Sequence, residues 1–76
     1  MEDVSKWDKE AGLAETYPIP SKAWALQASE IWAGRSETAF QESLKYPTDT
    51  VNTIKYLTAS YHAANAARVW KRRSEE

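Results

Sequence analysis

The chain has 76 residues and a net charge of −1, contains no cysteine, and includes only 11 leucine, isoleucine, valine and phenylalanine residues. A domain this small, without disulfides or thiolate zinc sites, must be held together by the packing of its own elements or by a partner. The near-neutral charge is not a polyanion-binding composition, and four tryptophans and four tyrosines supply the apolar surface that an ordered core needs.

The N-terminal segment predicts a short helix over about residues 3–16. Asp3 is a residue type that caps helices, and apolar residues follow it at helical spacing: Val4, Trp7, Ala11 and Ala14. Residues 17–20, Tyr-Pro-Ile-Pro, cannot continue the helix, because each proline lacks a backbone donor and favours an extended predecessor. We therefore expect an elbow at 17–20.

A second helical region is predicted over residues 21–45, with Ser21 as its N-cap. Gly34 leaves two alternatives open. It either closes this helix in a left-handed conformation, so that a new helix starts near Ser36, or it lies on the polar face of one continuous helix. The periodicity permits both, and we prefer the turn. A loop follows at residues 46–49, which include Pro47.

The long C-terminal helix is predicted over residues 50–73, capped by Asp49 or Thr48. Its apolar residues form two edges: Ile54, Leu57, Tyr61 and Ala64 on one, and Tyr56, Ala59, Ala63, Ala67 and Trp70 on the other. Together they exceed the ~100° arc that one neighbour requires, so this helix should touch two helices or one helix and a partner. We predict a single all-α domain over residues 1–76, a small bundle of three or four helices built on an antiparallel helical hairpin.

Residues that could support catalysis or hold a cofactor are few. His62 is the one histidine, and neither a second histidine nor a cysteine stands near it to complete a transition-metal site. With only Gly12 and Gly34, no glycine-rich loop can hold a nucleotide phosphate. We predict no catalytic, cofactor-binding or metal-binding residue, and therefore no enzyme.

A basic cluster at the end of the last helix supports an alternative function. Arg68, Lys71, Arg72 and Arg73 surround an aromatic residue, and such clusters can bind the phosphates of nucleic acid while the ring stacks on a base. The other interpretation is that cations at a helix C-terminus complement the helix dipole. Since Glu75 and Glu76 follow directly, we favour the second interpretation and expect neither nucleic acid nor membrane as a partner.

The tryptophans are the feature that points most directly to a function. So many indole rings are hard to bury in so small a domain, and tryptophan is a preferred anchor at protein interfaces. We predict a non-catalytic interaction protein, an adaptor, small subunit or inhibitor, whose partner is another protein or a second copy. The residues expected to bind the partner are Trp24, Trp32, Tyr56 and Trp70, whereas Ile54, Leu57 and Tyr61 are expected in the core. No signal peptide is recognisable, which predicts a cytoplasmic protein.

Trp32-Ala33-Gly34 resembles the motif of the WxG family, small helical-hairpin substrates of type VII secretion. Ser36, Ala39-Phe40-Gln41 and Leu44 follow at offsets usual for the second helix of that family. The resemblance implies that Gly34 forms the turn between two antiparallel helices and that Trp32 packs at the hairpin tip. It also implies secretion without a cleaved signal.

Overall fold

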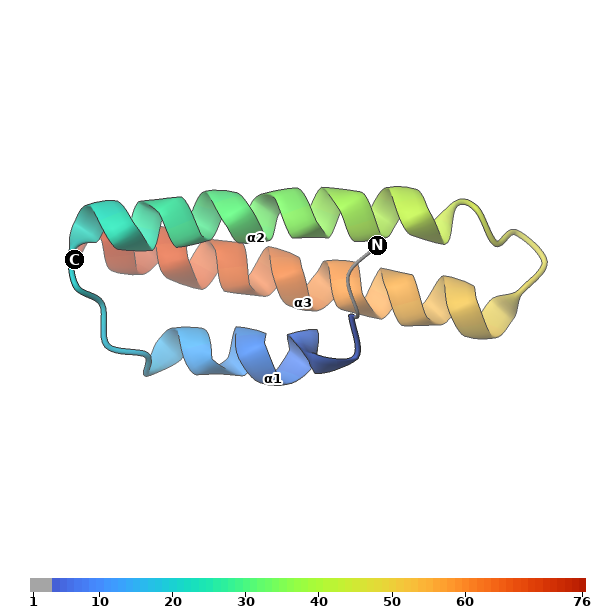
Figure 1. Cartoon of the computed structure of the whole chain (residues 1–76), viewed down its shortest axis with the longest axis horizontal. Coiled ribbons are helices and arrows are strands. Elements are labelled where there is room, and N and C mark those ends of the chain that lie inside the picture. The colour runs from blue at the N-terminus through green and yellow to red at the C-terminus, as the bar shows by residue number, and fades with distance from the viewer. Residues whose placement is uncertain (1–3) are drawn as a thin grey trace.

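The computed structural model describes residues 4–76, which form helices and the loops between them (Figure 1). Helix α1 spans Trp7–Gly12 and lies between two short 3-10 helices, η1 at Val4–Lys6 and η2 at Leu13–Glu15. Helix α2 spans Lys22–Ser43 and helix α3 spans Thr50–Ser74. Residues 4–76 contain no β-strand, so the prediction of an all-α chain is confirmed.

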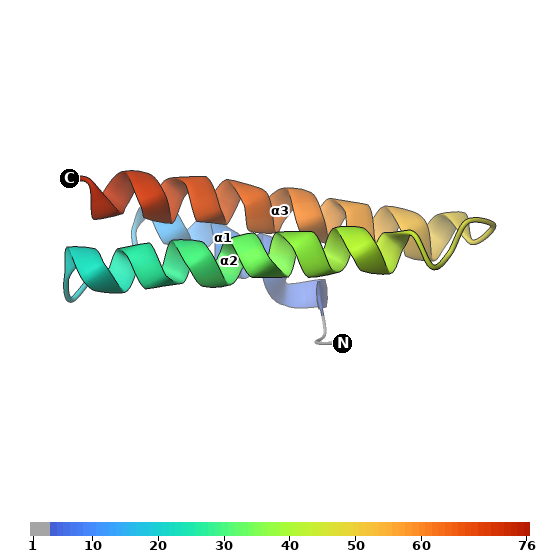
Figure 2. The same cartoon turned by 90° about the horizontal axis from the view of Figure 1, so that it is seen from above.

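Helices α2 and α3 run antiparallel and pack against each other along their length, forming a hairpin (Figures 1 and 2). Helix α1 packs against α3 on one side of this hairpin. The molecule extends 43 Å along the hairpin and 18 and 17 Å across it. Helix α3 therefore has two helical neighbours, as predicted, although only one of its two apolar edges is buried between them. None of the helices within the described range is long and apolar enough to cross a membrane.

Side-chain caps start both long helices. Ser21 Oγ accepts a hydrogen bond from the backbone N–H of Trp24 at 3.1 Å, as predicted for this N-cap. Of the two candidates before α3, Asp49 is the cap, and its Oδ1 accepts from the backbone N–H of Asn52 at 3.2 Å. The side-chain amide of Asn52 also donates to Asp49 Oδ2, at 2.6 Å. Together the backbone and side-chain hydrogen bonds from Asn52 hold the pKa of the Asp49 carboxyl below its usual range. Asp3, predicted as the cap of the first helix, lies outside the described residues.

The turn expected at Gly34 is wrong, because α2 continues through this residue. None of the described residues has a positive φ, so Gly34 does not adopt the left-handed conformation that a turn there requires. A Cβ built on Gly34 meets no atom within 4 Å, so close packing does not require a glycine here either. The chain reverses instead between Ser43 and Thr50, around Pro47. Trp32 therefore lies in the middle of α2 and not at a hairpin tip.

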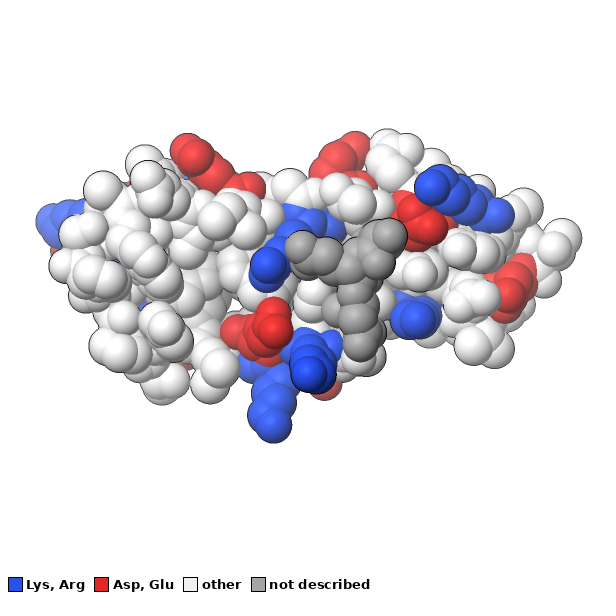
Figure 3. Space-filling view, in the orientation of Figure 1, with Lys and Arg blue, Asp and Glu red and all other residues white. Residues whose placement is uncertain are grey.

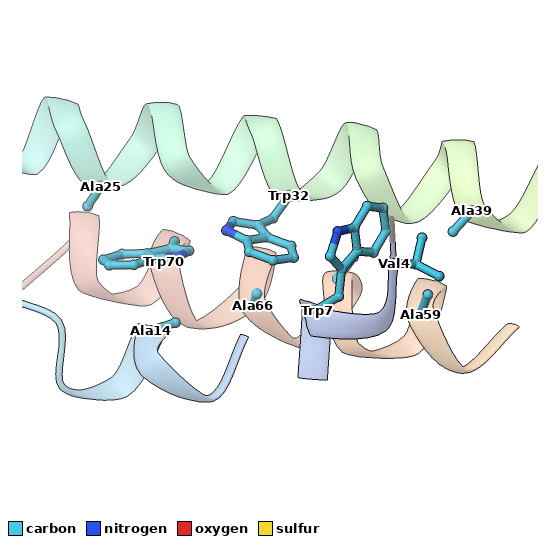
Figure 4. Packing of buried hydrophobic residues seen from close by; sticks show 10 residues of the cluster. Val4, Trp7, Ala14, Ala25, Trp32, Ala39, Ala59, Ala66 and Trp70 are labelled. Carbon is cyan, nitrogen blue, oxygen red and sulfur yellow. The ribbon is translucent and has the colours of Figure 1, made fainter. Parts of the chain in front are cut away.

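The core consists mainly of tryptophan and alanine (Figure 4). Within residues 4–76 its ten buried apolar residues are Val4, Trp7, Ala14, Ala25, Trp32, Ala39, Ala59, Ala63, Ala66 and Trp70. In Figure 4 the three indole rings lie in a row between the ribbons of α2 and α3. Small alanines let the helix backbones approach closely, and the large flat rings fill the space between them. In this core, a few tryptophan rings therefore fill the space between helices that leucine side chains usually fill.

The leucines and isoleucines lie outside this core, which corrects one prediction. Ile54, Leu57 and Tyr61 were expected to be buried, yet 57%, 43% and 64% of their surfaces are exposed. They lie on the edge of α3 that faces neither α1 nor α2. The second edge of α3, which includes Ala59, Ala63 and Trp70, is the one that enters the core.

Candidate protein interaction surface

Two of the aromatic residues expected to bind a partner form a cluster near the start of α2. Trp24 packs edge to face on Trp70, with ring centroids 5.1 Å apart, and Tyr17 stacks on Trp24 at 5.6 Å. The guanidinium of Arg73 lies 5.3 Å from the centroid of the Trp70 ring. Trp70 is only 5% exposed, so its ring belongs to the core and cannot be a surface anchor. Trp24 is half-buried.

Trp32 is buried in a second cluster, at 7% exposure. Its ring packs edge to face on Trp7 of α1 at 5.9 Å, and the guanidinium of Arg35 lies 4.5 Å from the Trp32 centroid and 5.8 Å from that of Trp7. Glu10 approaches the same guanidinium at 3.8 Å. Contacts of this kind between a partly buried cation and aromatic rings stabilise a fold. Trp32 thus holds α1 against the hairpin, which is a structural role.

Tyr56 is the fourth predicted residue and lies at the other end of the hairpin. Its ring stacks on Tyr46 with centroids 5.7 Å apart, and Lys55 Nζ lies 5.4 Å from the Tyr56 centroid. Tyr56 is half-buried. The four predicted residues therefore fall into three separate clusters that pack within the chain, and they do not form a single aromatic surface.

The basic end of α3 is largely engaged by the N-terminal region. Arg73 Nη1 donates to the carbonyl oxygen of Ala14 at 2.8 Å and also to that of Tyr17. Arg72 pairs with Glu15 at 2.6 Å. On the side that carries α1, basic and acidic side chains alternate and do not form a patch of one sign (Figure 3). Two of the four residues in the predicted nucleic-acid cluster are therefore engaged, and Arg68 and Lys71 make no such contact with α1, η2 or the 17–20 segment within residues 4–76. This arrangement gives the nucleic-acid alternative no support.

His62 lines a shallow groove between α1 and α3, together with Asp8, Asn65 and Arg68. The groove is open and its walls combine both signs of charge. Within residues 4–76 no group of three or more histidine, aspartate and glutamate side chains is placed to hold a metal ion.

The side of the hairpin opposite α1 carries apolar residues that no described element covers. Two serines mark the line along which α2 meets α3: Ser29 Oγ donates to the carbonyl oxygen of Ala67 at 2.8 Å, and Ser36 Oγ lies 3.1 Å from Ser60 Oγ. At 100° per residue, Leu26 and its successors at seven-residue intervals lie on one side of these serines. The residues of α2 that contact α1 lie on the other side.

The same geometry applies to α3, where apolar residues lie beside Ser60 and Ala67 on the side away from α1. We call the combined surface the open face. It consists of Leu26, Ala33, Phe40 and Leu44 on α2 and at its end, with Leu57, Tyr61 and Ala64 on α3. All of these are exposed except Ala64, which is half-buried. The arrangement can bind an apolar surface, and it brings together no pair of groups suited to acid–base chemistry.

This surface was not predicted from the sequence, because the partner-binding residues were expected to be mainly tryptophans. The signal was present, since Leu26, Ala33 and Phe40 recur every seven residues, which is the spacing of a helical contact stripe. On α3 the edge containing Leu57 and Tyr61 was recognised but assigned to the core. No protein family model, curated protein or solved structure matches the chain.

Proposed function

We propose that this chain is a non-catalytic protein interaction module that binds its partner through the open face. The observation that carries the proposal is the gathering of five large apolar side chains, all exposed, on the one side of the hairpin that α1 leaves uncovered: Leu26, Phe40, Leu44, Leu57 and Tyr61. Single exposed leucines are ordinary on protein surfaces, whereas a continuous apolar strip marks a contact site.

The size of the strip agrees with a weak, reversible contact. Complete burial of a leucine or phenylalanine contributes about 1.5–3 kcal/mol, and association costs roughly 4–15 kcal/mol. Phe40 and Leu26 are 44% and 45% exposed, so only part of that contribution is still available to a partner. The free energy gained by burying these side chains therefore exceeds the cost of association only slightly. This favours a module that assembles with its partner and dissociates again, as an adaptor, small subunit or inhibitor does.

A photocrosslinking experiment in the cells that produce the protein tests this proposal. The photoreactive amino acid p-benzoylphenylalanine is placed at position 40, on the open face, or at position 31 as the control. Ile31 is also a large exposed apolar residue of α2, but it lies on the side of the helix away from the open face. We expect discrete protein adducts, with any protein including a second copy, from position 40 and at most a few per cent of that yield from position 31. Equal yields from the two positions would contradict the proposal.

A further inference from the structure

We propose that the open face binds the open face of a second copy, in a two-fold arrangement that pairs Glu30 with Arg68. This inference rests on the proposed function and specifies its partner. It is argued from the charges that flank the open face and from the size of that face.

Glu30 and Arg68 lie close to the same level along the hairpin, on its two outer edges. Ser29 bonds to the carbonyl of Ala67, and because α2 and α3 are antiparallel the residues that follow this pair move apart. Glu30 and Arg68 are therefore offset by about 3 Å along the hairpin at 1.5 Å of rise per residue, a distance that two long side chains can span. By helical periodicity Glu30 borders the open face on the α2 edge and Arg68 borders it on the α3 edge. Both are exposed, and neither has an ion pair among residues 4–76. Within residues 4–76 the Arg68 guanidinium donates to the amide oxygen of Asn65, and its side chain also lines the groove between α1 and α3, so it must turn toward the open face to meet Glu30 of a second copy.

Two face-to-face arrangements with two-fold symmetry are available to a hairpin. If the axis is parallel to the helices, α2 of each copy lies on α3 of the other, and each Glu30 faces an Arg68. If the axis crosses the helices, α2 lies on α2, and Glu30 approaches Glu37 of the second copy. Like charges in contact oppose association, so the position of Glu30 favours the parallel axis.

The apolar residues agree with this choice. Ser36 is level with Ser60, so Phe40 is level with the residue before Leu57, and Ala33 is level with the residue before Ala64. In the selected arrangement Phe40 meets Leu57 of the second copy, and Ala33 meets Ala64 of the second copy. Small residues then meet at the centre of the interface, where they allow the helices to approach, and large residues fill the space farther out.

The open face is large enough for a weak dimer. From Leu26 to Leu44 it runs about 27 Å at 1.5 Å per residue, and the molecule is 18 Å wide. The footprint is therefore roughly 500 Å² per copy, so a dimer buries close to the lower limit of about 1,000 Å² for a specific interface. At this size the flanking charges matter to the equilibrium.

Sedimentation equilibrium of the full chain at low salt tests the arrangement. We expect a reversible monomer–dimer equilibrium. Glu30→Arg and Arg68→Glu should each weaken dimerisation about tenfold, because each substitution turns two attractive pairs into two repulsive ones. An equimolar mixture of the two variants should dimerise as the unaltered chain does, since both pairs are then restored between unlike copies. Lys55→Glu, the same charge change on the α1 side of α3, should have no effect.

The outcomes separate this inference from the proposed function. A strictly monomeric chain up to about 1 mM would overturn self-pairing, while adducts with other proteins at position 40 would still support the interaction module. A dimer that is indifferent to both charge reversals, or two variants that fail to recover on mixing, would overturn the two-fold arrangement. Absence of adducts at position 40 would remove both proposals together.

Discussion

The two sides of the α2–α3 hairpin are formed by the same helices but carry different apolar residues. The side that α1 covers has tryptophan and alanine, including Trp32 and Ala63, and these residues are buried. The open face has leucine and phenylalanine, including Leu26 and Phe40, and these are exposed. Both sides are apolar, so hydrophobicity alone does not decide which one is covered. The covered side offers flat rings and small residues that pack closely, and α1 supplies Trp7 to complete that packing.

Truncation of one large residue on each side is the strongest test of this comparison. Trp32→Ala should lower the free energy of unfolding by about 3–5 kcal/mol, because it leaves a cavity where Trp7 and Arg35 pack. A chain of this length has a total stability of only roughly 4–11 kcal/mol, so this loss is a large share of the whole and should lower Tm strongly. Phe40→Ala should cost no more than about 1 kcal/mol, since its ring is already partly in water. Circular dichroism during thermal and urea unfolding measures the free energy of unfolding of both variants. Similar losses of stability in the two variants would contradict the difference between the two sides.

Replacing a small residue on each side by a larger one should change stability less than these truncations do. The covered side should again be more sensitive than the open face. Ala63 is fully buried, and Ala63→Leu should destabilise the chain by about 1–3 kcal/mol, because the added atoms must displace packed neighbours. Ala33 is exposed on the open face, and Ala33→Leu should change stability by no more than about 0.5 kcal/mol. Urea unfolding of the two variants measures the difference. A buried leucine tolerated at position 63 would mean that the core is loosely packed.

The contrast also explains how much of the fold could be predicted from the sequence. Local signals gave the Ser21 and Asp49 caps, the helical class and the wide apolar arc of α3, because each depends on neighbouring residues only. Gly34 was misjudged because glycine favours a turn in isolation, whereas the helix propensity of the residues on both sides carries α2 through it. A single glycine costs about 1 kcal/mol in a helix, which the tertiary contacts of a long helix readily offset.

The candidate site was predicted less well, for a physical reason. Tryptophan is enriched both at interfaces and in small cores, and periodicity alone cannot tell which role Trp32 or Trp70 has. The position of α1 settles it, because Trp7 closes one side of the hairpin and leaves the other uncovered. That choice depends on how residues far apart in the chain fit together. What the sequence did contain was the seven-residue spacing of Leu26, Ala33 and Phe40, which marks the uncovered side.

The smallest expected effect comes from Gly34, which lies on the outer side of α2 and belongs to neither face. Gly34→Ala should stabilise the chain by about 0.5–1 kcal/mol, because alanine restricts the unfolded chain more and its methyl group meets no neighbouring atom. Gly12→Ala is the matched control at the last residue of α1, where the chain passes directly into η2 and the α-helical hydrogen bonding ends, so alanine should give a smaller gain. Thermal unfolding measures stability, and sedimentation measures self-association in the same samples. Because Gly34 touches neither face, its substitution should raise Tm and leave association unchanged. A loss of stability would instead mean that α2 bends or breaks at this residue in solution, and the line of Leu26, Ala33 and Phe40 would then no longer form one surface.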